Sequence, residues 1–344
     1  MGTTLKVGII GCGAIAQKLH VPDIHTCGLG ELVAFCDVLP AKARALAEQY
    51  GTNAKVYADY RELLRDKRVE AVVVALPNVL HGPVTIAAAK AGKHVQVEKP
   101  MATSLEEAQR MIDAAKRAGT KLMVNQSQRL FPEHRKAKEV LDSGILGKIL
   151  HVSAMFGHAG PEHWSPTGKW FFRKKDARFG AMADLGVHKA DLVRFLTGKE
   201  VAEISAFHDR IEKKNSDVED NFVSCLKFAD GTLGTLSASW TVKGSSAEYT
   251  FLHCVNGTLR VSVVPGKPVI ANLVNPRCEI VFDPPPPIER YPGSWGIDAG
   301  GAFVRAMLGL EKPYCTGEEG MKALAIILAA EKASLTGRRV RVSY

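Results

Sequence analysis

The segment LKVGIIGCGAIA, residues 5–16, decides the fold of this chain. Its first six residues are an apolar run that predicts a buried β-strand, and Gly11–Ala16 then follow the pattern G-x-G-x-x-A before a helical stretch. In this pattern Gly11 permits a tight turn, Gly13 lets a pyrophosphate approach the backbone, and Ala16 allows helix and strand to pack closely. The free N–H groups of the helix N-terminus attract phosphate. We therefore expect a dinucleotide-binding βαβ unit here.

A second predicted strand, residues 31–36, ends at Asp37, which lies 24 residues after Gly13. An acid at this distance accepts hydrogen bonds from the adenosine ribose hydroxyls and repels a 2′-phosphate, so NAD is favoured over NADP. Lys42 and Arg44 follow and could tolerate a phosphate, but they fit the exposed face of a helix better.

The rest of the first 124 residues alternates strands with helices. Apolar runs at 71–76 and 92–97 predict buried strands of a parallel sheet, and a further strand is expected at 121–124. This alternation is typical of a doubly wound sheet. The predicted class is α/β, with an N-terminal Rossmann dinucleotide-binding domain over residues 1–124.

After Asn125 the pattern changes. We expect, in chain order, a helix at 134–143, a strand at 148–156, a long irregular segment at 157–180 and a helix at 181–197. Alternation such as that of residues 221–228 predicts an antiparallel sheet with one covered face. Pro284–Pro287 predicts a rigid loop. Residues 125–344 are thus predicted to form an α+β domain with an open, mostly antiparallel sheet, whose final helix is able to pack back on the first domain.

Composition excludes several classes of protein. A chain of 344 residues favours two domains. Its net charge of +9 is diffuse, and the densest clusters, Arg173–Lys175 and Arg338–Arg339, lack the aromatic pattern of a nucleic-acid platform. No apolar run is long enough to cross a bilayer, and no secretory signal is visible at Met1. We expect a cytoplasmic protein without nucleic-acid or membrane partners.

The 7 cysteines are scattered and form no C-x-x-C pair, which argues against a disulfide scaffold or a zinc site.

Glu98-Lys99-Pro100 closes the predicted strand at 92–97. Ligands in open α/β sheets lie beyond the carboxyl ends of the strands, so Lys99 is a cation directed at the ligand crevice, and Pro100 fixes the turn. A surface lysine in a loop is the alternative for this residue taken alone.

Asp184 and His188 are spaced i, i+4 in the predicted helix at 181–197, which places them on one face. A histidine titrates near neutrality and can take a hydroxyl proton, while a carboxylate one turn away can raise its basicity or hold the same hydroxyl. The alternative is a polar helix face. Two such residues could begin a metal site, but no further partner has metal-like spacing, so we expect no metal.

Taken in order, these motifs resemble the Gfo/Idh/MocA oxidoreductase family over essentially the whole chain. The resemblance rests on Gly11–Ala16, Asp37, Pro77-Asn78 with His81, the run Ala91–Val95, Glu98-Lys99-Pro100, the pattern D-L-G-x-H-x-x-D at Asp184–Asp191, and Gly317 with Gly320.

The resemblance implies an NAD-dependent dehydrogenase acting on CH–OH groups, with a sugar, sugar derivative or inositol as the other substrate. It makes Lys99 the catalytic lysine that polarises the oxygen, His188 the acid/base, and Asp184 the residue that orients the substrate. It assigns to the cofactor Gly11, Gly13, Ala14, Ile15, Ala16, Asp37, Pro77, Asn78, His81, Glu98, Lys99 and Asn125.

Further substrate contacts are expected from the irregular segment and its surroundings. Trp164 and Trp170 could stack on the C–H faces of a pyranose or cyclitol, although such rings equally serve to anchor a loop. Arg129 and His158 are candidates for contacts to hydroxyl or carboxylate groups. Family members often carry glycines where Arg178-Phe179 stand here, so we expect a bulkier or more cationic pocket wall.

Two other functions stay open at this point. Some relatives in the family are glycosidases that retain NAD and act by transient oxidation and elimination. A catalytically silent NAD-sensing protein is a third possibility, since fold alone does not give function. By the resemblance we expect a homodimer or homotetramer.

Overall fold

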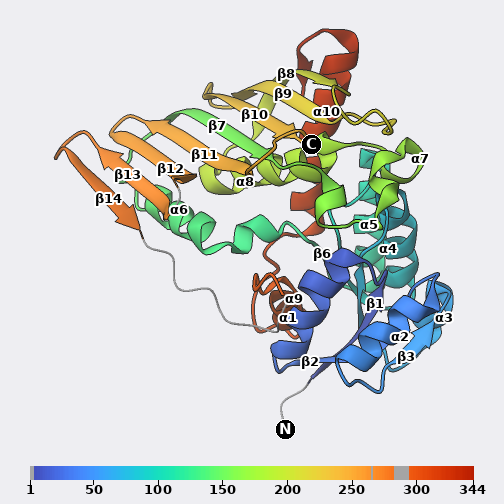
Figure 1. The fold of residues 1–344 in the computed structure, drawn as a ribbon. Coiled ribbons are helices and arrows are strands. Elements are labelled where there is room, and N and C mark those ends of the chain that lie inside the picture. The colour runs from blue at the N-terminus through green and yellow to red at the C-terminus, as the bar shows by residue number, and fades with distance from the viewer. Residues whose placement is uncertain (1–3, 265, 283–293) are drawn as a thin grey trace.

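The computed structural model describes residues 4–264, 266–282 and 294–344, which form two sheets with their helices (Figure 1). The first sheet is parallel and has the strand order β3-β2-β1-β4-β5-β6. Its strands are β1 Leu5–Ile10, β2 Gly30–Cys36, β3 Lys55–Tyr57, β4 Ala71–Val74, β5 His94–Val97 and β6 Leu122–Val124. The strand order reverses between β1 and β4, and ligands of such sheets bind beyond the carboxyl ends of the strands at this point.

Helices cover both faces of this sheet, because its central strands β1 and β4 are buried on both sides. One core joins the sheet to α1 and α2, and the opposite core joins it to α3, α4 and α5. These elements are η1 Ala16–His20, α1 Val21–Thr26, α2 Pro40–Gln49, α3 Tyr60–Arg65, η2 Asn78–Leu80, α4 His81–Lys90 and α5 Leu105–Ala118. The predicted doubly wound Rossmann fold is confirmed.

The second sheet has nine strands in the order β14-β13-β12-β11-β7-β10-β9-β8-β15. Among the strands that the structure describes, only the pair β7 and β10 is parallel, so the predicted mostly antiparallel sheet is also confirmed. The strands are β7 Ile149–Gly157, β8 Val201–Asp209, β9 Asn221–Phe228, β10 Leu233–Ser239, β11 Ala247–Cys254, β12 Gly257–Val264, β13 Lys267–Leu273, β14 Cys278–Phe282 and β15 Val340–Arg341.

One face of the second sheet is covered by helices α6 Pro132–Asp142, α8 Val187–Thr197 and α10 Gly317–Thr336, as Figure 1 shows. Short helical segments join these elements: η3 Ser127–Leu130, η4 Pro161–His163, η5 Lys169–Phe172, α7 Lys174–Ala177 and η6 Met182–Gly186. Buried side chains of η6 and α8 pack into the core of this sheet, so the helical segment that we predicted over residues 181–197 lies against the sheet.

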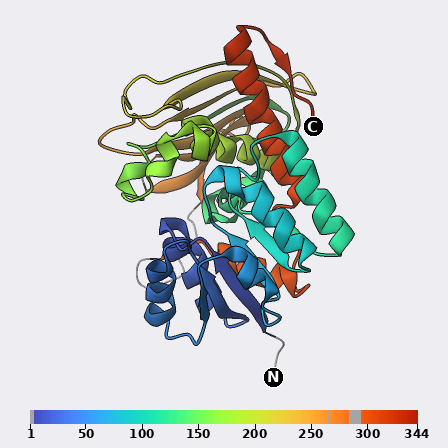
Figure 2. The same ribbon diagram turned by 90° about the vertical axis from the view of Figure 1, so that its right-hand side faces the viewer.

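The late part of the chain returns to the first sheet. Helix α9, Ala299–Met307, packs against α1, and the N–H of Val124 in β6 donates to the carbonyl of Cys315 (3.0 Å). Helix α10 then runs between α5 and the second sheet (Figure 2). We did not predict α9, because Gly300 and Gly301 lower its intrinsic helix propensity and its stability comes from packing.

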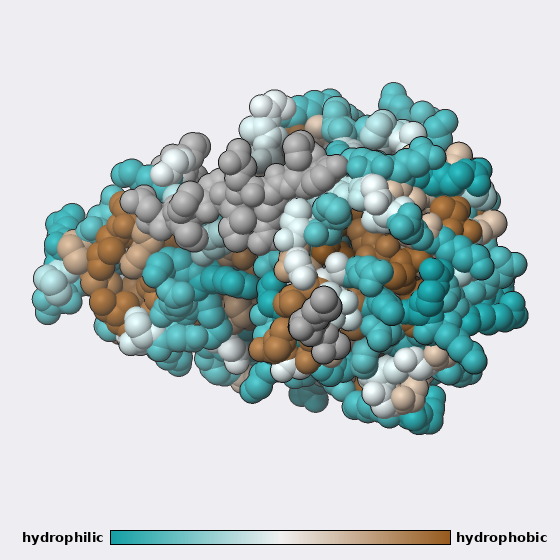
Figure 3. All heavy atoms as spheres, turned by 90° about the horizontal axis from the view of Figure 1, so that it is seen from below, coloured by the Kyte–Doolittle hydropathy of each residue, from teal (hydrophilic) through white to brown (hydrophobic). Residues whose placement is uncertain are grey.

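On the face seen in Figure 3, hydrophobic residues form separate patches among hydrophilic ones. Within the described ranges, the helices lack the combination of length and apolar character that a membrane crossing requires. Pro284–Pro287, the predicted rigid loop, lies outside the described residues.

Candidate active site

The Lys99 side chain reaches from the end of β5 to the start of the helix that carries Asp184. Its Nζ donates to the Asp184 carbonyl (2.7 Å) and to Oδ1 of the same residue (2.8 Å). The other carboxylate oxygen accepts a hydrogen bond from Nε1 of Trp240 (2.9 Å). A lysine ammonium has three N–H groups, and residues of the described ranges accept two of them, so the third is able to donate to a substrate oxygen. No sequence motif marks Trp240, because its indole approaches Asp184 only through the sheet topology.

Asp184 lies in η6, a single π-helical segment that precedes the regular α8. We predicted one continuous α-helix, and π-helical turns of this kind are frequent at functional sites. The structure therefore differs from the prediction in the first turn, where Asp184 points toward Lys99.

Glu219 holds the start of η6. Its Oε1 accepts hydrogen bonds from the N–H groups of Gly180 (2.8 Å) and Met182 (3.0 Å), and its carbonyl accepts one from Ala181 (3.0 Å). A Cβ on Gly180 would lie 1.8 Å from the Glu219 carbonyl oxygen, so this position requires glycine. Burial raises the pKa of Glu219 to about 7.

His188 lies at the start of α8, buried beside Phe156, whose ring centroid is 6.1 Å from the imidazole. Burial, followed by the charges of Lys99 and Lys189, holds the pKa of His188 well below its usual value. Its Nδ1 has no hydrogen-bond partner within the described ranges. The imidazole is therefore neutral near pH 7 and able to accept a proton.

His158 follows β7 and lies within electrostatic range of Asp184 and Lys99. Its Nδ1 accepts the N–H of Gly160 (2.9 Å), so the ring proton is on Nε2. Burial lowers the pKa of His158 as well. The neutral ring can then act as a hydrogen-bond donor through Nε2.

The two tryptophans of the irregular segment both contact Phe171. Trp164 meets it edge-on, with centroids 5.4 Å apart, and Trp170 stacks on it at 3.8 Å. The Trp164 carbonyl also accepts a hydrogen bond from Nζ of Lys18 in η1 (2.9 Å). The rings thus anchor the segment, and Lys18 ties it to the helix after the glycine-rich loop.

The two arginines considered from the sequence face other partners. Arg129 forms two hydrogen bonds with Asp191 (2.7 and 2.6 Å) and a third with Glu319 (3.2 Å). Arg178 pairs with Glu331 of α10 (2.7 and 3.0 Å), so its charge is matched there. The structure therefore engages the Arg129 guanidinium between helices rather than toward Lys99.

The glycine-rich loop suits a dinucleotide. At Gly11, where φ is +95°, an added Cβ would lie 2.1 Å from the Ala75 carbonyl, whereas at Gly13 nothing lies within 4 Å. The space beside Gly13 is therefore open to a phosphate group. Asp37 Oδ2 accepts the N–H of Cys12 (3.0 Å), which places the carboxylate beside the loop.

The remaining candidates for cofactor contact surround the same strand ends. Asn78, directly after Pro77, donates from Nδ2 to the carbonyl of Ala177 (2.8 Å) and so joins η2 to α7. The ring nitrogens of His81 face the carbonyls of Pro100 (2.7 Å) and Leu76 (2.8 Å). His81 thus links two turns of the first sheet, and one of them is the Lys99 turn.

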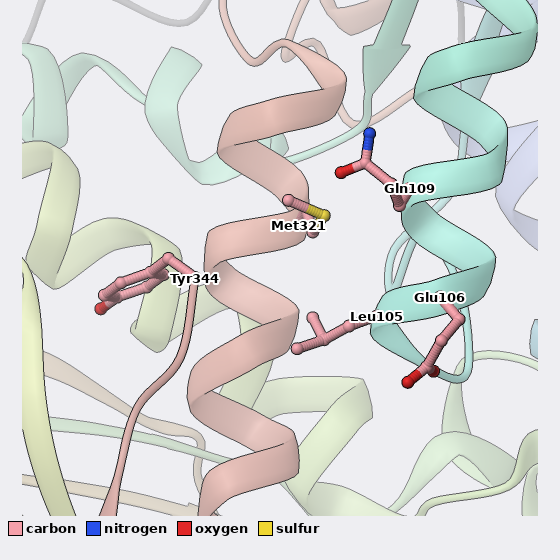
Figure 4. Close-up of a pocket in the computed structure, with 5 residues that line it drawn as sticks. All are labelled: Leu105, Glu106, Gln109, Met321 and Tyr344. Carbon is pink, nitrogen blue, oxygen red and sulfur yellow. The ribbon is translucent and has the colours of Figure 1, made fainter.

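A hollow of about 420 Å³ lies elsewhere, between α5 and α10 (Figure 4). It is lined by Leu105, Glu106, Gln109, Met321 and Tyr344. None of these residues belongs to the set that meets around Lys99. Across the described residues, His, Cys, Asp and Glu side chains form no group of three suited to a metal ion.

Comparison with known proteins gives a consistent family. Residues 5–126 match the family described as "Oxidoreductase family, NAD-binding Rossmann fold", and residues 134–260 match the "GFO/IDH/MocA C-terminal domain". A 1,5-anhydro-D-fructose reductase of Ensifer adhaerens is 31% identical over 97% of this chain and 98% of its own length. A myo-inositol 2-dehydrogenase of Thermotoga maritima is 28% identical, with 98% of each chain covered.

Solved structures share the fold over the full length. An aldose-aldose oxidoreductase from Caulobacter crescentus, complexed with glycerol, superposes with a TM-score of 0.85 at 26% identity, covering 98% of this chain and 99% of its own. A levoglucosan dehydrogenase in complex with NADH and levoglucosan has a TM-score of 0.87 at 24% identity, covering 99% and 100%.

Proposed function

The chain belongs to the Gfo/Idh/MocA family of NAD-binding oxidoreductases, and from this premise we propose that it transfers a hydride between NAD and a secondary hydroxyl of a sugar, sugar derivative or inositol. The observation that carries the proposal is the contact between Lys99 and Asp184, with the neutral His188 in the next helical turn. These groups can bind an alcohol oxygen, stabilise negative charge on it and take its proton.

In this proposal the glycine-rich loop holds the cofactor. The open space at Gly13 takes the pyrophosphate, and the Asp37 carboxylate accepts the ribose hydroxyls. Pro77 and Asn78 form the neighbouring turn of the crevice. When bound, NAD supplies the hydride chemistry, and the protein supplies orientation and electrostatics.

The protein's own residues manage the charge and the proton. The free N–H of the Lys99 ammonium donates to the substrate oxygen and stabilises the alkoxide character that develops as the C–H bond breaks. His188 accepts the hydroxyl proton, and in the reverse direction it returns the proton to the carbonyl oxygen. Asp184, held by Lys99 and Trp240, fixes the ammonium in place.

Two observations support a polyhydroxylated ring as the substrate. The relatives include a 1,5-anhydro-D-fructose reductase and a myo-inositol 2-dehydrogenase, which act on polyhydroxylated rings by their names. In this chain, His158 offers a donor at Nε2 for a further hydroxyl, and Phe156 offers an apolar face beside His188. We assign Arg129 a structural role, because Asp191 and Glu319 occupy its guanidinium.

A substrate panel with Lys99→Ala tests the proposal. The wild type should produce NADH absorbance with at least one sugar, anhydro-sugar or inositol, and Lys99→Ala should lower turnover by about a thousandfold or more while NAD still binds. Full activity in that variant would remove the mechanism. Cleavage of a glycoside without net NADH would instead favour the NAD-retaining glycosidase.

The pH profile tests His188. Because its pKa lies below the ordinary value near 6.5, the proton acceptor stays unprotonated at and below neutrality. Alcohol oxidation should therefore lose activity only as the pH falls below about 6.5, and His188→Ala should remove that limb of the profile. An unchanged limb in His188→Ala would assign the proton to another group.

A further inference from the structure

A network of buried hydrogen bonds lies directly behind the Lys99 turn, and three of its residues, Gln96, Tyr314 and His20, belong to none of the motifs. Gln96 Nε2 donates to the hydroxyl of Tyr314 (3.1 Å), and that hydroxyl donates to Oδ1 of Asn125 (2.6 Å). Asn125 Nδ2 donates to Oε1 of Glu98 (2.6 Å), and Nε2 of His20 meets the same oxygen at 2.7 Å. These hydrogen bonds therefore join β5, the end of β6, η1 and the segment before α10.

The ionisation state of Tyr314 and the amide of Asn125 determine which atom donates in each of these hydrogen bonds. Burial keeps the pKa of Tyr314 well above its usual value, so its hydroxyl stays a donor. That donor selects the orientation of the Asn125 amide, because a flipped amide would turn Oδ1 toward the Glu98 carboxylate. Tyr314 thus determines that Asn125 presents N–H groups to Glu98.

Glu98 uses its carboxylate inside the protein. Besides the two donors on Oε1, its Oε2 accepts the backbone N–H of Lys99 (3.1 Å). Burial alone would raise the pKa of this carboxyl, but the hydrogen bond and charge of His20 hold it below its usual value. An ionised carboxylate with these donors fixes the backbone from which the Lys99 side chain extends.

His20 itself is fully buried, and within the described ranges its Nδ1 has no hydrogen-bond partner. The proton needed for the 2.7 Å contact is therefore on Nε2, directed at Glu98. The polar function of the buried His20 ring is therefore to donate this hydrogen bond and hold the Glu98 carboxylate in place.

We infer that His20 and Tyr314 are positioning residues for Lys99, acting through Glu98 and Asn125. The inference rests on the proposed function only in assigning Lys99 to hydride transfer. It also assigns the Glu98 carboxylate to the Lys99 turn, where the sequence alone suggested a cofactor contact.

Tyr314→Phe tests the inference, because it removes one hydroxyl and leaves the ring in place. We expect kcat to fall about tenfold, while the KM for NAD and the NAD affinity, measured by tryptophan fluorescence in the absence of substrate, stay within twofold. Tyr249→Phe, in β11 of the second sheet, is the matched control and should leave kcat unchanged.

His20 is tested by a pair of variants. His20→Leu removes the donor to Glu98 and should lower kcat more than Tyr314→Phe, whereas His20→Gln retains an N–H and should recover most of the loss. A purely structural role would lower the melting temperature of both variants without separating their kcat values, and that result would overturn the inference.

A second measurement reads Lys99 without using catalysis. Competitive acylation of the folded protein, followed by mass spectrometry, reports the reactivity of the Lys99 amine. We expect it to change severalfold in Tyr314→Phe and His20→Leu and to stay constant in Tyr249→Phe. Unchanged reactivity and unchanged kcat in folded variants would overturn the inference. Changed reactivity together with a fully active Lys99→Ala would instead contradict the proposed function alone.

Discussion

Two buried glutamates hold the two sides of the Lys99–Asp184 contact, and they do so in opposite electrostatic states. Glu98 holds the Lys99 turn, and side-chain donors from His20 and Asn125 keep its pKa below the usual value. Glu219 holds the start of η6 through backbone N–H groups alone, and burial raises its pKa to about 7. The two carboxylates accept similar numbers of hydrogen bonds, so the difference between their pKa values comes from neighbouring charges. His20 and Lys99 lower the pKa of Glu98, whereas the negative charge of Glu331 raises the pKa of Glu219.

One side of the Lys99–Asp184 contact therefore keeps a fixed charge, while the other side is able to change its protonation state. Backbone amides orient a carboxylate well, but they do not replace a cation in a buried environment. The turn that carries the proposed catalytic cation is therefore fixed over a wide pH range, and the helix that carries Asp184 is coupled to pH through Glu219.

The largest expected effect comes from removing the charged member. Glu98→Leu leaves the donors of His20, Asn125 and Lys99 unpaired in a buried place, and the apparent free energy of unfolding should fall by about 3–5 kcal/mol. Chemical denaturation measures this loss, with Glu98→Gln as the control that keeps the shape and one acceptor. A loss below about 1 kcal/mol would mean that the carboxylate is not engaged as described.

The next effect is a pH dependence at Glu219. Between about pH 4.5 and 7 the folded carboxyl holds a proton that the unfolded one has released, so the folded state loses stability as the pH rises through this window. The wild type should lose about 3 kcal/mol relative to Glu219→Gln across it. Denaturation of both proteins at several pH values checks the slope, and parallel curves would contradict a raised pKa.

A smaller effect is expected at Gly180, where a Cβ would lie 1.8 Å from the Glu219 carbonyl. Gly180→Ala should cost about 2 kcal/mol and lower turnover, because the start of η6 must move. Gly13→Ala is the matched control: nothing lies within 4 Å of its Cβ, so stability should hold while NAD affinity falls. Equal stability losses in the two variants would show that the contact to Glu219 is not specific.

The smallest effect concerns the neighbour of Glu219. Glu331→Gln removes a like charge, so the pH midpoint of the Glu219 effect should fall by less than about one unit. The same denaturation series reads this shift, with Glu318→Gln on the first turn of α10 as a control. A rise in the midpoint would mean that Glu331 lowers the pKa of Glu219, which would contradict the repulsion between the two carboxylates.

Much of the fold could be predicted because it is encoded in short, local patterns. The segment at 5–16, the acid at Asp37 and the apolar runs of β4 and β5 each have their own sequence signal, and together they specify a parallel sheet. Motifs also proposed Lys99, Asp184 and His188 as candidate site residues, and the structure adds the contact between Lys99 and Asp184.

The rest of the site has no local signal. Trp240, His20, Tyr314 and Glu219 are single residues whose partners lie far away in the chain, so neither spacing nor periodicity marks them. Helix α9 was missed for the same reason, since its formation depends on packing against α1. Arg129 is a different case. From the sequence we expected it to contact a hydroxyl or carboxylate group of the substrate, whereas in the structure its guanidinium donates two hydrogen bonds to Asp191.

The return of the chain to the first sheet has a consequence for the order of synthesis. Strand β6 gains its contacts to Cys315 and Thr316, and Asn125 gains the Tyr314 hydroxyl, only from the late segment of the chain. Domains generally fold from the N-terminus as they leave the ribosome. Here the N-terminal sheet can assemble its strands early, but the hydrogen-bonded support of Lys99 is complete only after residue 316 of 344 has emerged. A chain cut short before that point would form a nucleotide-binding fold whose Lys99 turn lacks its last hydrogen-bonded support.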